Sequence, residues 1–316
     1  MPGPQISVVV ATHDRPLRLA RLLAGLRAQT LAPDRFEVVV VNDGSGPATA
    51  DVLAAPSEAG ALALHTVRHE RALGPGAARN TGWRAAQAPL IAFTDDDCVP
   101  TARWLEEILL VHRAHPRAVI QGPTQPDPAE LPGAGVFSRT VEIRGLGPQY
   151  ETCNIAYPRE TLDALGGFDE RFGLRPGGED TDLAWRAIAT GHPTVFAQEA
   201  AVHHAVERLG PLGKLRVASR WTETMRIFAE HPQTRKMLTR GMFWNVWHYL
   251  LLRSLLALAL PAWARRFLIA RHLIELRRRA HRDGAGSWAI PYLLVHDLIE
   301  FGSVARGAIR YRTPVL

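Results

Sequence analysis

The sequence predicts an α/β fold, with a mostly parallel central sheet covered by helices on both faces and a helical C-terminal region after it. Short, wholly apolar runs alternate with segments of helical periodicity through the first part of the chain, which is typical of buried parallel strands. Polar clusters follow the ends of several of these runs. Strand patterns thin out after residue 205, so we expect one domain over 1–205 and a second region over 206–316.

The first strands and helices are expected in alternation. The leucines of residues 15–29 recur near helical spacing, and the segment 74–87 also has a helical pattern. The apolar runs around them are short and rich in Val, Ile and Leu, as buried strands are. We therefore expect strands over residues 6–12, 36–43, 62–68 and 90–94.

The middle third adds a second group of elements. Residues 151–173 contain a short strand, a helix that begins after Pro158 and a Gly-Gly turn. Two acidic residues, Glu179 and Asp180, open a helix expected within 176–192. Because acidic side chains at a helix N-terminus also interact favourably with the helix dipole, capping alone is an equally good explanation of their position.

The cysteine content and the N-terminal sequence indicate the cellular compartment in which the protein is expected. Only Cys98 and Cys153 occur, too few for a disulfide framework or a cysteine metal site, which favours a reducing compartment. Residues 1–16 lack a basic segment followed by a long apolar one, so no signal peptide is expected. We expect a cytoplasmic protein.

Polar side chains gather after the first, second and fourth predicted strands. In parallel sheets, ligands bind beyond the carboxyl ends of the strands, so these clusters predict one shared cleft. The alternative for each cluster taken alone is a turn or a helix cap, since Asp, Asn and Ser favour those positions. The residues concerned are Thr12, His13, Asp14, Arg15, Asn42, Asp43, Asp95, Asp96 and Asp97.

Three consecutive aspartates end the apolar run 90–94. Like charges repel, and a buried strand end is a costly place for carboxylates unless a cation is bound there. Asp95 and Asp97 can both reach one site if the chain turns after Thr94. A small number of oxygen ligands suits Mg²⁺ or Mn²⁺, with water and phosphate oxygens completing the coordination. We therefore expect a divalent metal and a nucleotide diphosphate here; the alternative is a solvated acidic turn.

Six segments occur in a characteristic order and spacing: VVVATHDRP, VVVVNDGS, GPGAARNTGW, FTDDDCVP, CNIAYPRETLDALGGFDERFG and GGEDTDLAWR. Each is weak alone, but the ordered set resembles the inverting glycosyltransferases of family 2, whose Rossmann-like fold is called GT-A. The resemblance covers about residues 5–205. It implies transfer of a sugar from a nucleotide-sugar donor, expected to be UDP-linked, with Mn²⁺ or Mg²⁺ as the metal.

The resemblance also implies roles for donor-binding side chains. Asp43 would accept a hydrogen bond from the ring N–H of a uracil-type base, and Arg79 would lie near the base or the diphosphate. Asp95 would hold the ribose or a metal-bound water. The candidate nucleotide-binding residues are Thr12, His13, Asp14, Arg15, Asp43, Arg79, Asp95 and Asp96.

The metal site implied by the resemblance contains Asp97, with Asp95 as a further candidate. A histidine after a later strand commonly completes the metal site in this fold, and the segment AAVHHAV offers His203 and His204. Neighbouring residues of a strand face opposite sides, so one of the two would point inward. We favour His203 slightly over His204 as the ligand.

Asp180 is the catalytic base that the resemblance implies. In an inverting transfer the acceptor hydroxyl attacks the anomeric carbon opposite the departing diphosphate, so one carboxylate must take the hydroxyl proton. Glu179, its neighbour, either positions the acceptor or caps the helix. The acceptor is expected to be a saccharide, lipid-linked or otherwise close to a membrane.

The C-terminal region is the basic part of the chain: residues 205–316 carry 19 basic and 7 acidic side chains. The apolar segment 242–266 has a narrow polar stripe of Asn245, His248 and Arg253, which favours a helix in a bilayer interface or packed on a core over one that crosses a membrane. Seven arginines follow within 265–282. We expect this region to bind peripherally to an anionic membrane surface.

The alternative is that these helices pack on the first domain or form a homodimer interface, with the arginines as a solvated face. Nucleic acid is not an expected partner, because the tail lacks the glycine–aromatic patterns of recognition modules.

Two other functional classes compete with glycosyl transfer. A nucleotidyltransferase would need a glycine-rich basic loop after the first strand, and the segment ATHDRPLRL has no glycine. A non-catalytic sugar-nucleotide-binding protein would have lost the acidic motifs, and both are present. A processive synthase would carry a Gln-x-x-Arg-Trp segment; here Arg220 and Trp221 are kept but position 217 is Val. Single transfer is therefore favoured.

Overall fold

The computed structural model describes residues 3–54, 62–174 and 177–316. It contains two compact units, the first of Met1–Ala129 and Thr140–Ala205 and the second of Glu130–Arg139 and Val206–Leu316. A short segment around residues 130–139 thus joins the second unit, although it precedes residue 205 in sequence. The separation into a catalytic and a membrane-associating part stays a prediction.

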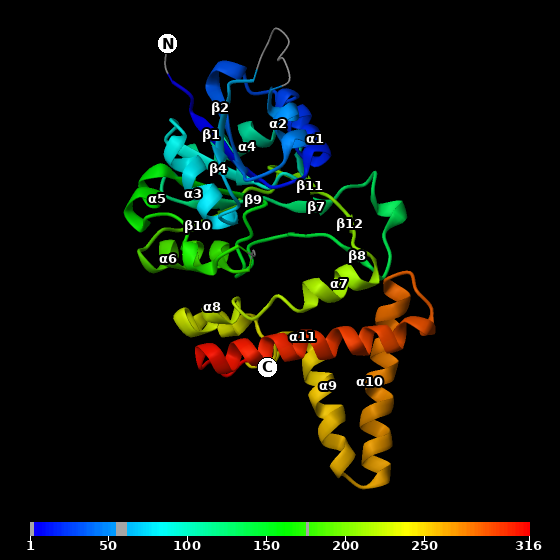
Figure 1. The fold of residues 1–316 in the computed structure, drawn as a ribbon. Coiled ribbons are helices and arrows are strands. Elements are labelled where there is room, and N and C mark those ends of the chain that lie inside the picture. Colours follow the sequence, from blue (N-terminus) through cyan, green and yellow to red (C-terminus); the bar gives the residue numbers. More distant parts are fainter. Residues whose placement is uncertain (1–2, 55–61, 175–176) are drawn as a thin grey trace. The chain divides into compact units, whose positions relative to one another are not determined.

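The first unit is built around a seven-stranded sheet with the order β10-β6-β9-β4-β1-β2-β3 (Figure 1). Neighbouring strands are parallel except around β9, which is antiparallel to both β4 and β6. The predicted mostly parallel α/β sheet is therefore confirmed. Its strands are β1 (Ile6–Thr12), β2 (Phe36–Asp43), β3 (Leu64–His69), β4 (Leu90–Thr94), β6 (Val119–Gln121), β9 (Asn154–Pro158) and β10 (Thr194–Phe196).

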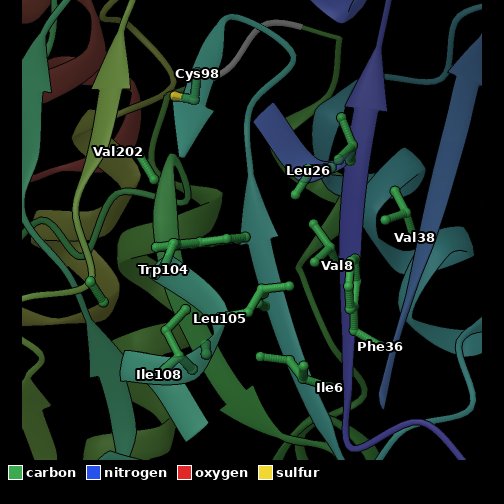
Figure 2. Packing of buried hydrophobic residues seen from close by; sticks show 14 of the residues in the cluster. Ile6, Val8, Leu26, Phe36, Val38, Cys98, Trp104, Leu105, Ile108 and Val202 are labelled. Carbon is green, nitrogen blue, oxygen red and sulfur yellow. The ribbon is translucent and has the colours of Figure 1, made fainter. Parts of the chain in front are cut away.

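Helices cover both faces of this sheet because successive strand residues point to opposite sides. Val8 and Val10 belong to one buried cluster and Val9 to the other. The first cluster is covered by α1 (Pro16–Arg27), α2 (Pro47–Ala54) and α4 (Trp104–Ala114), and the second by α3 (Pro75–Ala85), α5 (Arg159–Leu165) and α6 (Glu179–Ala189). Figure 2 shows Trp104 and Leu105 of α4 in the same buried cluster as Ile6 and Val8 of β1.

A small second sheet lies beside the end of β4. In it β11 (Val202–His204) pairs in antiparallel with β5 (Cys98–Pro100) and in parallel with β7 (Thr124–Pro126). The register sets His204 opposite Cys98, and the backbone N–H of Ala205 donates to the carbonyl of Asp97. This pairing brings the histidine pair next to the aspartate cluster. Two single turns of 3-10 helix, η1 (Pro33–Arg35) and η3 (Glu170–Phe172), complete the unit.

The second unit is mainly helical. Helix α11 (Ile290–Tyr311) packs on α7 (Gly210–Ala218), α8 (Met225–Glu230), α9 (Val246–Leu256) and α10 (Ala262–Arg282). A two-stranded ladder of β8 (Ser138–Arg139) and β12 (Glu207–Arg208), with the 3-10 turns η2 (Leu131–Gly133), η4 (Pro232–Met237), η5 (Ala257–Ala259) and η6 (Ser287–Ala289), makes up the rest of its regular structure. Over the described residues, none of the helices combines the length and the hydrophobicity that crossing a bilayer requires.

Element bounds agree closely with the sequence where strands are buried. The expected strands 6–12, 36–43 and 90–94 match β1, β2 and β4, whereas the expected strand 62–68 is observed over Leu64–His69 at the sheet edge. The helix expected within 176–192 begins at Glu179; Pro176 lies outside the described residues. Cys98 and Cys153 are both free and buried, as expected of packing residues.

Candidate active site

The polar clusters predicted from the sequence meet at the carboxyl ends of β1, β2 and β4. Their contacts form three neighbouring groups: His13 with Asp43, Arg15 and His204 with the aspartates 96 and 97, and Arg79 with Asp95 and Glu179. Two of these groups join residues that lie about 100 positions apart in sequence.

Hydrogen bonds within the chain fix the carboxylate of Asp43 in place. One carboxylate oxygen accepts hydrogen bonds from the backbone N–H of Leu73 at 2.9 Å and lies 2.7 Å from Nδ1 of His69; the other accepts from the N–H of Gly74 at 2.9 Å. Gly74 has a φ of 99°, and a Cβ there would lie 2.4 Å from the carbonyl oxygen of Gly173, so only glycine fits. The hydrogen bond that Asp43 would accept from the ring N–H of a base stays a prediction.

His13 and Asp14 form the more exposed side of this region. Nδ1 of His13 lies 2.7 Å from the backbone oxygen of Asp43, and half of the His13 side chain is exposed. Asp14 has a φ of 51° and accepts a hydrogen bond from the N–H of Gly46 at 2.9 Å. Aspartate tolerates this left-handed conformation better than most residues. The loop after β1 is therefore tied to the loop after β2.

The middle of the aspartate cluster binds to the end of β1 and the start of α1. Thr12 donates its hydroxyl proton to Asp96 at 2.7 Å, and one guanidinium nitrogen of Arg15 lies 3.3 Å from Asp96 and 2.6 Å from Asp97. Burial of Asp96, together with the neighbouring Asp97 and against the charge of Arg15, raises the pKa of Asp96 to about 6. A cationic side chain thus occupies one side of Asp97.

Arg79 connects the two acidic segments. From α3 it donates to Asp95 at 2.8 Å and to Glu179 at 3.0 Å, and its side chain is almost fully buried. Burial opposes the charge on Asp95, but the charge of Arg79 and its hydrogen bond outweigh this and lower the pKa of Asp95 below its ordinary value. Asp95 and Glu179 are therefore brought to one place by a single guanidinium.

Asp180 lies in the first turn of α6, next to the ion pair between Arg79 and Glu179. Its carboxylate accepts a hydrogen bond from the backbone N–H of Thr181 at 2.8 Å. Burial, with the nearby charges of Glu179 and Glu151, raises the pKa of Asp180 well above its ordinary value. A carboxyl group with a raised pKa holds a proton more strongly, which is the property that a general base needs.

The structure corrects the preference between the two histidines. Nε2 of His204 lies 3.6 Å from Asp97, and His204 is buried, whereas His203 pairs opposite Val99 in the small sheet. Because the side chains of a strand alternate, the register that turns His204 toward Asp97 turns His203 to the other face. His204, and not the slightly favoured His203, is brought beside the aspartate.

The side chains beside Asp97 fit a divalent cation. Nδ1 of His204 lies 2.8 Å from the backbone oxygen of Ala205, so a hydrogen bond from Nδ1–H leaves the Nε2 lone pair facing Asp97. The separation of 3.6 Å between that Nε2 and the carboxylate oxygen is close to the roughly 3 Å expected of adjacent ligands of an octahedral ion. Cys98 also lies in this group. Burial raises the pKa of its thiol well above the ordinary value, so it stays protonated and is a poor ligand.

Two residues near the site were not singled out from the sequence. His69 bridges Asp43 and the hydroxyl of Thr81, at 2.7 and 3.0 Å. Glu151 is a third carboxylate whose charge acts on Asp180. His69 directly follows the predicted strand 62–68 and ends the observed β3, and that position could have marked it; Glu151 has no such local signal.

Asp182, two residues after Asp180, is buried on α6. It pairs with Arg186 at 2.8 Å, four residues along the same helix. Asp182 therefore stabilises α6 and the placement of its first turn.

Comparison with known proteins finds similar sequences among glycosyltransferases. Residues 7–151 match the sequence model of the family described as glycosyl transferase family 2. The validoxylamine A glucosyltransferase of Streptomyces hygroscopicus subsp. limoneus is 29% identical over 286 residues, which is 78% of this chain and 61% of that protein. The pre-mycofactocin glycosyltransferase of Mycobacterium tuberculosis is 29% identical over 215 residues, 63% of this chain and 42% of that protein. The chain therefore spans only about half of the length of these relatives.

Solved structures share the fold. A mannosyltransferase from Pyrobaculum calidifontis, in complex with GDP-Man and Mn²⁺, has a TM-score of 0.62 and 20% identity, over 99% of this chain and 88% of that chain. A fragment of S. aureus TarS in complex with UDP-GlcNAc has a TM-score of 0.56 and 17% identity, over 98% and 92% of the two chains. The predicted GT-A fold is confirmed by these similarities.

Replacing Arg79 with methionine tests the buried connection. Arg79→Met keeps much of the side-chain volume but leaves Asp95 and Glu179 as unpaired buried carboxylates, which should cost about 3–5 kcal/mol of unfolding free energy. The pKa of Asp95 is lowered in the folded protein, so its contribution is present above the ordinary value of 3.8 and is lost as the pH falls through the folded value. Urea denaturation should therefore show a larger loss at about pH 7 than at about pH 2, where the carboxylate is protonated.

Arg84→Met is the matched control, because Arg84 lies on the same helix with half of its side chain exposed. Its expected cost is about 0.5 kcal/mol or less at either pH. Equal losses in the two variants would mean that the buried pairs do not hold the site together.

Proposed function

Residues 7–151 of this chain match the model of glycosyl transferase family 2, and from this premise we propose that the protein is an inverting glycosyltransferase. It moves a sugar from a nucleotide-sugar donor, with UDP-linked donors favoured, to a hydroxyl group of a saccharide or lipid-linked acceptor. The observation that carries the proposal is the bridge of Arg79 between Asp95 and Glu179, which sets a donor-side and an acceptor-side carboxylate next to each other.

Asp180 acts as the base in this reaction. The acceptor oxygen forms a bond to the anomeric carbon while the bond from that carbon to the diphosphate oxygen breaks, and the hydroxyl proton passes to Asp180. The hydrogen bond from the N–H of Thr181 fixes the orientation of the carboxylate. The raised pKa of Asp180 makes it a stronger proton acceptor than an exposed aspartate.

Asp97 and His204 are the residues that would hold the divalent metal, Mn²⁺ or Mg²⁺. When bound, such an ion supplies positive charge that stabilises the departing diphosphate. Arg15 and Arg79 add fixed positive charge on either side of the aspartate cluster, at 2.6 Å from Asp97 and 2.8 Å from Asp95. These side chains therefore favour a donor with two negatively charged phosphates.

The names of the similar proteins support the donor class. The mannosyltransferase structure holds GDP-Man with Mn²⁺, and the TarS structure holds UDP-GlcNAc, so proteins of this fold bind sugars linked to different nucleotides. The relatives named for validoxylamine A and pre-mycofactocin are glycosyltransferases as well. We propose a nucleotide-sugar donor for this chain on the same ground.

Asp180→Asn tests the base. The amide cannot accept the hydroxyl proton, so kcat should fall about 10²- to 10⁴-fold while the affinity for the nucleotide changes little. The measurements are initial rates with the donor that titration selects, and calorimetric titration with its nucleoside diphosphate. Asp163→Asn, at an exposed position of α5, should keep the wild-type rate. Turnover of Asp180→Asn near the wild-type rate would remove Asp180 from this role.

Glu151→Gln tests how the pKa of the base is set. The charge of Glu151 contributes to the raised pKa of Asp180, so the neutral glutamine should lower that pKa. A base must be ionised to work, so the rate falls as the pH drops through its pKa. The acidic limb of the kcat–pH profile should therefore move to lower pH in Glu151→Gln. A limb that stays in place would show that Glu151 does not act on the base.

His204→Ala and His203→Ala are a matched pair for the metal site. Calorimetric titration with UDP and with GDP, each with Mn²⁺ and with EDTA, should show metal-dependent binding in the wild type. His204→Ala should weaken that binding about 10-fold or more, because it removes one of few ligands, while His203→Ala should leave it unchanged. The opposite order of effects would return the ligand role to His203.

A further inference from the structure

The hairpin of α9 and α10 ends in an exposed apolar segment, residues 255–267, which we call the hairpin tip. In Figure 1 the two helices lie side by side and lead away from α11, with their connection farthest from it. The first buried residue of α10 is His272, ten residues after the helix begins at Ala262. At 1.5 Å per residue, the part of α10 that precedes its first buried side chain is about 15 Å long.

The side chains of the hairpin tip are unusually apolar for an exposed segment. Residues 255–264 carry no charge, and 77% of Trp263 and 66% of Phe267 are exposed. Single exposed hydrophobic residues are normal, but a contiguous group marks a binding surface. The exposed members of this group are Leu255, Leu256, Leu258, Leu260, Trp263 and Phe267.

The polar stripe that the sequence shows on α9 faces inward. Asn245 caps the helix and donates to Glu300 of α11 at 2.8 Å, and Nε2 of the fully buried His248 lies 3.3 Å from the same carboxylate. Arg253 donates to the backbone oxygen of Leu268 on α10. The hairpin thus uses its polar groups, together with buried apolar residues such as Leu250 and Leu276, to fix its base to α11, and the exposed apolar residues lie toward the tip.

Three exposed arginines of α10 lie next to the apolar part of the tip, and we call them the arginine collar. Arg265 and Arg266 follow the uncharged residues 255–264 directly, and Arg271 lies further along the same helix toward its buried part. An apolar end with a tryptophan beside it and a cationic collar behind it is complementary to a bilayer interface, where acyl chains lie below anionic headgroups. The collar therefore matches one occupant by charge as well as by hydrophobicity.

We propose that the hairpin tip inserts end-on into an anionic lipid surface, with the arginine collar at the level of the headgroups. Interfacial segments of this kind enter the outer 5–10 Å or so of a leaflet, which is shorter than the exposed length of the hairpin. This inference goes beyond the proposed reaction and identifies a partner for the second unit. The sequence predicts a helix that lies in the plane of the bilayer interface. The proposed hairpin instead stands perpendicular to the membrane surface.

A second copy of the chain is a less suitable occupant. Two tips that packed on each other about a twofold axis would bring the collars of Arg265, Arg266 and Arg271 together, and like charges repel. Dimerisation through the tip is therefore an outcome that the experiment must be able to reveal.

Vesicle flotation of the full-length protein tests the proposal. Binding is expected to vesicles with about one third phosphatidylglycerol and much less to pure phosphatidylcholine, since each arginine near an anionic surface contributes roughly fivefold to the partition coefficient. Leu258→Ser with Trp263→Ser should lower the partition coefficient at least tenfold. Arg265→Gln with Arg266→Gln should lower it on anionic vesicles only.

Ile309→Ser is the matched control, because Ile309 is a hydrophobic residue of the same unit that is 80% exposed but lies on α11. It should bind vesicles as the wild type does. Equal binding by the tip variants and the wild type would overturn the proposal. So would a concentration-dependent dimer without lipid, seen by sedimentation, that the tip variants abolish.

Depth measurements separate end-on insertion from flat adsorption. Leu258→Cys and Leu273→Cys, each labelled with the fluorophore NBD, place one probe in the tip and one about 16 Å along α10 from its first residue. Lipids with a quencher in the acyl chain should quench the first probe and not the second. Similar quenching of both would show that the hairpin lies flat. Nucleotide titration with Mn²⁺ is independent of vesicle binding, so failure here and failure of the proposed reaction can be told apart.

Discussion

Buried ion pairs of Arg79 hold the acidic side chains of the candidate site together. Arg79 reaches from α3 to Asp95 at the end of β4 and to Glu179 at the start of α6. Without this guanidinium the two carboxylates would be like charges in a buried place, which is among the more costly arrangements in a protein. The placement of Asp180, one residue further along α6, follows from the same contact. The candidate site therefore depends on a helix that carries no proposed catalytic residue.

Much of the first unit could be predicted because its strands are buried on both faces. Continuous apolar runs gave the bounds of β1, β2 and β4, while β3 at the sheet edge shows the mixed pattern that shifted its start. The antiparallel direction of β9 could not be predicted, because a strand has the same apolar pattern in either direction. Direction is fixed by the connections, which residue periodicity does not describe.

Site residues were predictable in groups and less so one by one. Motif order placed the aspartate cluster, Asp180 and the histidine pair, but the choice of His204 over His203 depends on the register of β11 against β5. Glu151 is an isolated acidic residue whose importance comes only from its neighbours in space. The polar stripe of α9 was visible on a helical wheel, yet a wheel cannot show which side is covered by another helix.

The position of Arg15 has a thermodynamic consequence for how the site is filled. Its guanidinium lies 2.6 Å from Asp97, where a divalent ion is proposed to bind, so an arriving ion meets a positive charge already paired with its ligand. A donor diphosphate offers that guanidinium a new anionic partner. Ion and nucleotide then raise each other's affinity by the same factor, because linkage between two sites is reciprocal. If metal and donor bind as proposed, Arg15 would make their loading synergistic, so that either one alone would bind more weakly than the two together.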